Sequence, residues 1–280
     1  MNGELPYSSW LVASDIDSTL NNKKRELPPE NLKAVQDFVA KGGKFTLASD
    51  RNPELMTGHF DKLPISGTPA VVMGGAGIYD FTERKLLRFK PLSAASVEAA
   101  VNIAKKFPTL DFIIDTKDKQ YIAGIGFWAH FYLRKSHATH EYFRRIEDVP
   151  REDWGKIVFF GPMWRARQIG KALRAVEGRE YSVIDSSIVS VQIQAKGANK
   201  GTAVMEIAEM LGIAPDHTAA IGDYYNDYQM ISLVEISGCT ASAPKELKDK
   251  ADYVTCHCNK GAVADFLGYL TEKIKKIKNN

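Results

Sequence analysis

Cysteine is scarce in this chain of 280 residues, and the scarcity excludes one class of protein. Its three cysteines are Cys239, Cys256 and Cys258, and an odd, low number does not build the disulfide framework of a small secreted domain. Two of them flank His257, but one such pair without a second falls short of the ligand spacing of a zinc site. We therefore expect a cytoplasmic protein in which residues 253–256 form a strand that runs into a loop.

Strong charge imbalance and long apolar runs are also missing. The formal net charge is +3, and basic residues concentrate only near the last residues, so we expect no nucleic-acid partner. The longest mostly apolar run, residues 121–133, contains His130 and is too short to cross a bilayer, so we expect no membrane contact. Hydrophobic residues make up 44% and charged residues 25%, which is typical of a folded globular chain and excludes disorder as its main state.

Short apolar runs alternate with helical patterns at both ends of the chain. Strands are expected at residues 10–13, 45–48, 70–73, 218–221, 240–243 and 253–256. Apolar residues at helical spacing predict helices around residues 32–39, 204–211 and 263–270. Strands that alternate with helices indicate a parallel sheet covered by helices on both faces.

The middle of the chain has a different pattern. Helices are expected around residues 97–104 and 169–176, and strands at 112–114, 157–160 and 188–193. This pattern predicts a separate α+β unit at residues 83–189, inserted into a core made of residues 1–82 and 190–280. Ser49 and Lys200 lie about 150 positions apart, which leaves room for a small domain between them.

Polar residues follow the expected core strands or open a helix. They are Asp15 and Asp17 after the first strand, Ser49 after the second, Lys200 at a helix start, and Asp223, Asn226 and Asp227 after a late strand. Asp15 and Asp17 point the same way in extended chain, since side chains alternate along a strand. If the strands are parallel, all of these groups meet at the carboxyl edge of the sheet, where ligands bind in open α/β folds.

This set of side chains suits phosphate chemistry. Carboxylates can hold Mg²⁺, which prefers oxygen ligands. A hydroxyl, an ammonium group and backbone N–H groups can hold a phosphate. A carboxylate close to both is placed to attack phosphorus and form an aspartyl-phosphate.

Together these motifs resemble the haloacid dehalogenase-like phosphatases, and most closely their Cof-type sugar-phosphatase group. The resemblance covers nearly the whole chain and is strongest at residues 9–25, 43–52, 69–80 and 192–232. It implies an α/β fold with a Rossmann-like core and an inserted α/β cap. It also implies an Mg²⁺-dependent phosphatase acting on small phosphorylated metabolites, with sugar phosphates favoured.

The resemblance also implies a role for each matched residue. Asp15 corresponds to the nucleophile and Asp17 to the general acid and base. Ser49, Lys200 and Asn226 correspond to phosphate-binding residues. Asp15, Asp17 through its carbonyl, and Asp223 correspond to the metal ligands, and Asp227 supports them. We add Arg51, Trp128 and Arg134 as candidate contacts to the rest of the substrate.

Three positions depart from the family pattern, because Ser18, Asp50 and Tyr224 stand where glycine is usual. Asp50 would repel a phosphate unless it points away or pairs, and Arg51 is a candidate partner. Three alternatives stay open: a phosphomutase on the same scaffold, a non-catalytic phosphorylation switch, and a binding protein that has lost activity. The second carboxylate at Asp17 favours the enzyme.

Overall fold

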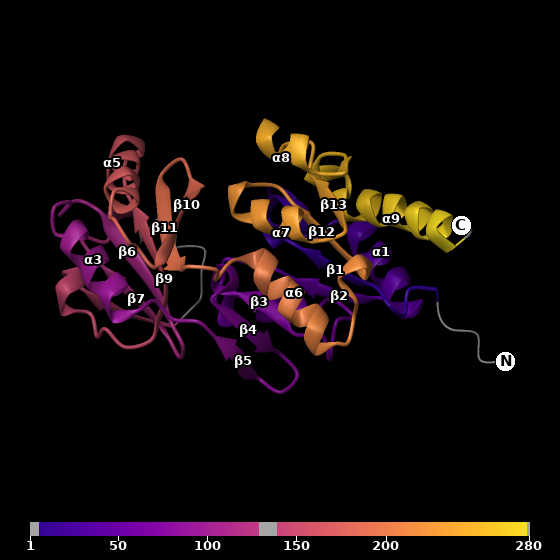
Figure 1. Ribbon diagram of the computed structural model, residues 1–280, viewed down its shortest axis with the longest axis horizontal. Coiled ribbons are helices and arrows are strands. Elements are labelled where there is room, and N and C mark those ends of the chain that lie inside the picture. The colour runs from indigo at the N-terminus through magenta and orange to yellow at the C-terminus, as the bar shows by residue number, and fades with distance from the viewer. Residues whose placement is uncertain (1–5, 129–138, 279–280) are drawn as a thin grey trace.

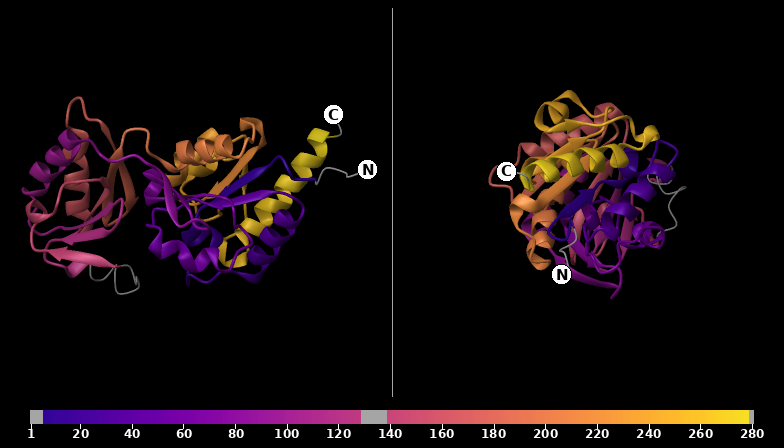
Figure 2. Two further views of the ribbon diagram at one scale, coloured as in Figure 1. Left: turned by 90° about the horizontal axis from the view of Figure 1, so that it is seen from below. Right: turned by 90° about the vertical axis from the view of Figure 1, so that its right-hand side faces the viewer.

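A five-stranded parallel sheet forms the centre of the first of two lobes. The structure is a computed structural model that describes residues 6–128 and 139–278. Figure 1 shows the two lobes side by side, with both termini at the outer end of the first lobe, and the left-hand view of Figure 2 shows the same separation from below. The sheet has the order β14-β13-β12-β1-β2, and all of its pairs are parallel. Its strands are β1 (Leu11–Ser14), β2 (Lys44–Leu47), β12 (Thr218–Gly222), β13 (Ile236–Cys239) and β14 (Tyr253–Val254).

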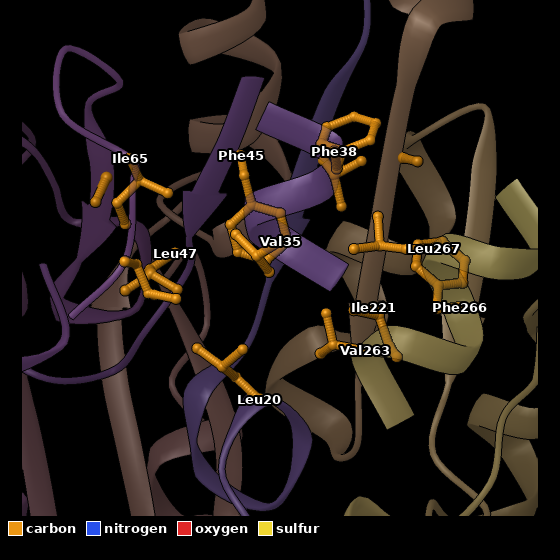
Figure 3. Close-up of a cluster of buried hydrophobic side chains, with 14 of the residues drawn as sticks. Leu20, Val35, Phe38, Phe45, Leu47, Ile65, Ile221, Val263, Phe266 and Leu267 are labelled. Atoms are coloured by element: carbon orange, nitrogen blue, oxygen red, sulfur yellow. The ribbon is translucent and has the colours of Figure 1, made fainter. Parts of the chain in front are cut away.

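Helices cover both faces of this sheet, as the sequence predicts. On one face α1 (Pro29–Ala40) and α9 (Ala262–Lys278) bury Val35, Phe38 and Phe266 against the strands, and Figure 3 shows this packing. On the other face α6 (Lys200–Met210) contributes Val204 and Ile207 to a second cluster. Three shorter helices complete the lobe: α2 (Thr57–Phe60), α7 (Tyr228–Leu233) and α8 (Lys245–Lys250).

A small antiparallel sheet connects the core to the second lobe. It consists of β3 (Ala70–Val72), β4 (Gly77–Asp80) and β5 (Lys85–Phe89), and a single parallel bridge from Val71 to Ala48 joins it to the core. The expected third core strand therefore exists, but it pairs mainly with β4.

The described part of the second lobe is a six-stranded, mostly antiparallel sheet with two helices on one face. Its order is β10-β11-β9-β6-β7-β8. The strands are β6 (Asp111–Thr116), β7 (Gln120–Ala123), β8 (His140–Phe143), β9 (Trp154–Phe160), β10 (Tyr181–Ser187) and β11 (Ser190–Ala195). Helices α3 (Ala94–Ala104) and α5 (Met163–Arg174) lie on the side away from the first lobe.

Strand pairing bears on the limits of the inserted unit. β5 pairs with β4, and β11 closes the six-stranded sheet by pairing with both β10 and β9. We therefore propose boundaries after Phe89 and after Ala195 in place of residues 83 and 189.

The prediction of a strand at residues 240–243 is wrong. The strand lies earlier, at Ile236–Cys239, and Ala243 closes a turn by donating its N–H to the carbonyl of Thr240 at 2.9 Å. Gly238 interrupts the apolar pattern because a side chain there would collide with the core: its Cβ would lie 2.4 Å from the Phe266 ring. Within the described residues, no helix combines the length and apolar character needed to cross a membrane.

Candidate active site

The turn after β1 presents Asp15 and Asp17 at the carboxyl edge of the core sheet. A short turn, η1 (Ile16–Leu20), follows the strand. The N–H of Asp15 donates to the carbonyl of Ile221 at 3.0 Å, which ties the turn to β12. Ser18 has a φ of 62°, in the left-handed region that favours glycine, so the serine carries about 1–2 kcal/mol of backbone strain. The glycine usual at this position would relieve that strain.

The side chain of Lys200 links acidic residues that come from two separate motifs. It is the first residue of α6, where Asn199 caps the helix by accepting the N–H of Thr202. The Lys200 Nζ donates to one carboxylate oxygen of Asp15 and to one of Asp227, each at 2.7 Å. Lys200 is only 1% exposed, so both ion pairs are shielded from water. The lysine therefore fixes Asp15 against the loop that follows β12.

Asp227 in turn holds the loop that carries Asp223. Its second oxygen accepts the backbone N–H groups of Asp223 and Tyr224, at 2.9 and 3.2 Å. Tyr224 has a φ of −140° and a ψ of −179°, which any residue adopts, so the tyrosine in place of glycine carries no strain. The predicted supporting role of Asp227 is consistent with these contacts and stays a prediction.

The site carries more negative charge than one ammonium group balances. Burial raises the pKa of Asp15 well above its ordinary value, although Lys200 opposes the rise. Burial, followed by the charge of Asp227, raises the pKa of Asp223 to about 7. Burial alone would lower the pKa of Lys200, but Asp15 and Asp227 outweigh it and raise that pKa. A second cation would relieve this crowding of carboxylates.

The donor set fits a magnesium ion. One carboxylate oxygen from each of Asp15, Asp223 and Asp227 lies within 4.8 Å of the others, and this is the one such group of potential metal ligands among the described residues. Hard oxygen ligands of this kind suit Mg²⁺. The cluster contains Asp15 and Asp223 of the predicted ligand set, whereas the side chain of Asp17 is engaged elsewhere. The cysteines near the end of the chain are not part of it.

Asp17 is bound by Arg51. The guanidinium group donates to both carboxylate oxygens of Asp17, at 2.7 and 3.0 Å, and to the carbonyl of Leu55 at 3.3 Å. Ser49 lies two residues after the end of the neighbouring strand β2 and is 2% exposed, and its hydroxyl accepts the N–H of Arg51 at 3.2 Å. Arg51 therefore orients the predicted acid and base, and the expected pairing of Arg51 with Asp50 is wrong.

Asp50 is balanced instead by residues of both lobes. One carboxylate oxygen accepts the side-chain amide of Gln192 on β11 at 3.0 Å, and the other accepts the amide of Asn226. Lys156 on β9 donates to the backbone carbonyl of Asp50. Burial opposes ionisation of Asp50, but the charges of Lys156 and then Lys200 outweigh it and hold its pKa below the ordinary value. The carboxylate is thus turned toward amides of its own protein.

A cavity of about 740 Å³ extends from these acids to the sheet of the second lobe. Trp128 lines it, and Arg134 lies outside the described residues. Sequence motifs did not indicate three polar residues of the second lobe that line the cavity, Asp115, Gln120 and Lys156, which are each 3% exposed. The sequence does contain a signal for Lys156, because it is a charged residue that directly precedes the apolar run Ile157–Phe160. The volume is in the range of sites that enclose a small organic molecule.

Comparison with known proteins identifies the class that this fold and site define. The chain belongs to the haloacid dehalogenase-like hydrolases, whose family model matches residues 12–267. It is therefore a hydrolase of this family, as its sequence motifs suggest.

Individual relatives match most of the chain. The 5-amino-6-(5-phospho-D-ribitylamino)uracil phosphatase of Bacillus subtilis is 24% identical over 245 residues, covering 88% of this chain and 89% of the relative. The phosphoglycolate phosphatase of Methanoculleus marisnigri is 23% identical over 244 residues, covering 87% and 89%. A solved structure of a sugar phosphatase of haloacid dehalogenase subclass IIB superposes with a TM-score of 0.80 at 16% identity, covering 94% of this chain and 99% of that one. That likeness extends the agreement in fold to the second lobe.

Proposed function

We propose that this protein is an Mg²⁺-dependent phosphatase that removes phosphate from small metabolites through an aspartyl-phosphate on Asp15. The observation that carries the proposal is the bridge from Lys200 to Asp15 and Asp227, buried beneath a cavity that Asp15, Asp17 and Ser49 all line. The two curated relatives named above, both of them phosphatases, support the reaction class. The cytoplasmic location stays a prediction from the sequence.

In the proposed first step Asp15 attacks phosphorus and the bond to the leaving oxygen breaks. Asp17, once released from Arg51 and protonated, gives its proton to that oxygen. Lys200 and the hydroxyl of Ser49 hold the transferring oxygens, where negative charge gathers. A Mg²⁺ ion held by Asp15, Asp223 and the carbonyl of Asp17 would neutralise further charge on these oxygens.

In the proposed second step Asp17 is a carboxylate. It takes a proton from a water molecule, whose oxygen attacks phosphorus and releases Asp15 and inorganic phosphate. The same carboxyl group therefore acts once as an acid and once as a base. The second lobe covers the cavity and limits access of bulk water during the transfer.

Turnover of a panel of phosphate esters with and without Mg²⁺ tests the activity. We expect release of inorganic phosphate that requires the metal and disappears in Asp15→Asn. Asp249→Asn, the same change at an exposed position of α8, is the matched control and should retain full activity. Full turnover by metal-free protein, or by Asp15→Asn, would contradict the mechanism. The panel includes sugar phosphates, which the sequence favours.

The lifetime of the phosphoenzyme separates a phosphatase from a phosphorylation switch. Asp17→Asn should lower the rate roughly 10²–10⁴-fold, the usual effect of a lost general acid and base. With an activated ester the first step needs little protonation, so phosphoenzyme should accumulate in Asp17→Asn but not in the parent. Rapid quench with a radiolabelled ester measures both. A long-lived parent phosphoenzyme that Asp17→Asn leaves unchanged would favour the switch, and return of phosphate to substrate would favour a mutase.

A further inference from the structure

The six-stranded sheet has one face for its helices and one for the cavity. Side chains alternate along each strand, so neighbours point to opposite faces. On β9, Ile157 and Phe159 join the buried cluster beneath α3 and α5, whereas Val158 and Phe160 line the cavity. The cavity face is the side turned toward the first lobe, because the helices cover the other side (Figure 1).

Part of the cavity face is an apolar wall. Ile113 lies between Ile122 on β7 and Val158 on β9 in the strand register, and these residues cluster with Phe160 and Trp128. Burying a hydroxyl group against such a wall without a partner is unfavourable, which disfavours the end of a polyol. A planar ring gains free energy there, because it removes apolar area on both partners from water.

Next to the apolar wall is a buried acceptor. The Gln120 Nε2 donates to Asp115 at 2.8 Å, and the other oxygen of Asp115 pairs with Lys156 at 3.1 Å. A carboxylate only accepts hydrogen bonds, so it fixes the amide with its nitrogen toward Asp115. The Gln120 Oε1 is then left without a hydrogen-bond partner within the described part of the chain. A buried acceptor in this state favours a ligand that brings an N–H or O–H donor.

We propose that this end of the cavity binds a planar heterocycle with a hydrogen-bond donor, so that the substrate is a phosphate monoester whose leaving group carries such a ring. The inference rests on the proposed phosphatase function and narrows its substrate class. The phosphate would lie beside Asp15 and Ser49, and the ring against Ile113 and Val158, since all four residues line one cavity.

Matched pairs of esters that differ only by the ring test the proposal. One pair is flavin mononucleotide and ribitol 5-phosphate, and the other is uridine 5′-phosphate and ribose 5-phosphate. In at least one pair, kcat/KM should be about 10-fold or more higher for the member with the ring, as expected when a ring buries apolar area. Equal or higher kcat/KM for the ring-free member in both pairs would overturn the proposal.

Variants of the cavity face locate the effect. Gln120→Met removes the acceptor at similar volume and should lower kcat/KM for the preferred ring-bearing ester roughly 3- to 10-fold, the value of one hydrogen bond. The loss for the ring-free ester should be clearly smaller, because only the lost hydrogen bond to Asp115 affects both esters. Gln168→Met, at an exposed position of α5, is the matched control. An equal loss on both esters would mean that Gln120 has only a structural role.

Two further measurements separate this proposal from the proposed function. Acetyl phosphate has no ring, so its Mg²⁺-dependent turnover reports the catalytic residues alone. Calorimetric binding of each ester to Asp15→Asn needs no turnover and gives the same comparison within each pair. If acetyl phosphate is not hydrolysed, the phosphatase proposal fails. If neither ring-bearing ester binds more tightly than its ring-free partner, the heterocycle proposal fails, whatever the result for acetyl phosphate.

Discussion

Lys156 offers the sharpest test of how the two lobes balance their buried charges. Its Nζ pairs with Asp115 at 3.1 Å, and both side chains are 4% exposed. It also donates to the carbonyl of Asp50 and holds the pKa of that carboxyl group down. Lys156→Met would keep the length of the side chain but leave the buried carboxylate of Asp115 and the partly buried one of Asp50 without this cation. Breaking a buried pair in this way costs about 3–5 kcal/mol of stability, and we expect a loss in that range.

A second substitution should restore most of the loss. Asp115→Asn removes one of the unpaired charges and still accepts the amide of Gln120. The double variant Lys156→Met/Asp115→Asn should therefore be more stable than Lys156→Met, although it carries more changes. Lys33→Met is the control for loss of a lysine, because the pair of Lys33 with Asp37 is exposed and its removal should change stability little.

Urea unfolding measures these differences. In a Trp10→Phe background, the remaining tryptophans are Trp128, Trp154 and Trp164, so fluorescence reports the second lobe alone. Circular dichroism reports both lobes and reveals whether they unfold in separate transitions. A loss below about 1 kcal/mol in Lys156→Met would mean that water reaches this pair and would refute the reasoning. The reasoning would also be refuted if Lys156→Met/Asp115→Asn were less stable than Lys156→Met.

Three further predictions follow from the site and its scaffold. Because the pKa of Asp223 is raised to about 7, protons compete with the metal below that pH; calorimetry should find Mg²⁺ affinity falling from pH 8 to pH 6, and an unchanged affinity would contradict the ligand assignment. Lys200→Met should lower turnover at least about 10²-fold. Addition of Mg²⁺ should raise the melting temperature of Lys200→Met more than that of the parent protein, because Asp15 and Asp227 have lost the ammonium group that balances them. Gly201→Ala should destabilise the fold by about 1–3 kcal/mol, because its Cβ would lie 2.5 Å from the carbonyl oxygen of Gln229. A Cβ at Gly268 within α9 would meet nothing within 4 Å, so Gly268→Ala should stabilise the protein instead. Urea unfolding compares the two variants, and equal changes in stability would contradict the close packing at Gly201.

Local patterns predicted the parts of the fold that local physics determines. The strands that end at Ser14, Leu47 and Gly222 are short apolar runs, and parallel pairing brings their polar successors to one edge. The meeting of Asp15 with Lys200 follows from that topology. The strand β8 was missed because its residues, His140–Phe143, are mostly exposed and do not alternate in polarity.

The balance of charge at Asp50 could not be predicted in the same way. Its partners Gln192 and Asn226 lie 142 and 176 positions further along the chain, and no local pattern links them to it. Nearness in sequence favoured Arg51 as the partner, but the guanidinium group reaches Asp17 instead. The pairing with Gln192 depends on how the two lobes meet, and the pairing with Asn226 depends on how the core loops meet; both are tertiary properties.

The alternation along β9 also has an evolutionary consequence. Residues that hold the second lobe together, such as Ile157 and Phe159, face α3 and α5, whereas Val158 and Phe160 face the cavity. Mutations on the cavity face can therefore change which molecule is accepted while the packing beneath the helices stays intact. An insertion of one residue within the strand would exchange the two faces and disturb both at once. Substitutions, rather than insertions, are the route by which such a protein can acquire a new substrate.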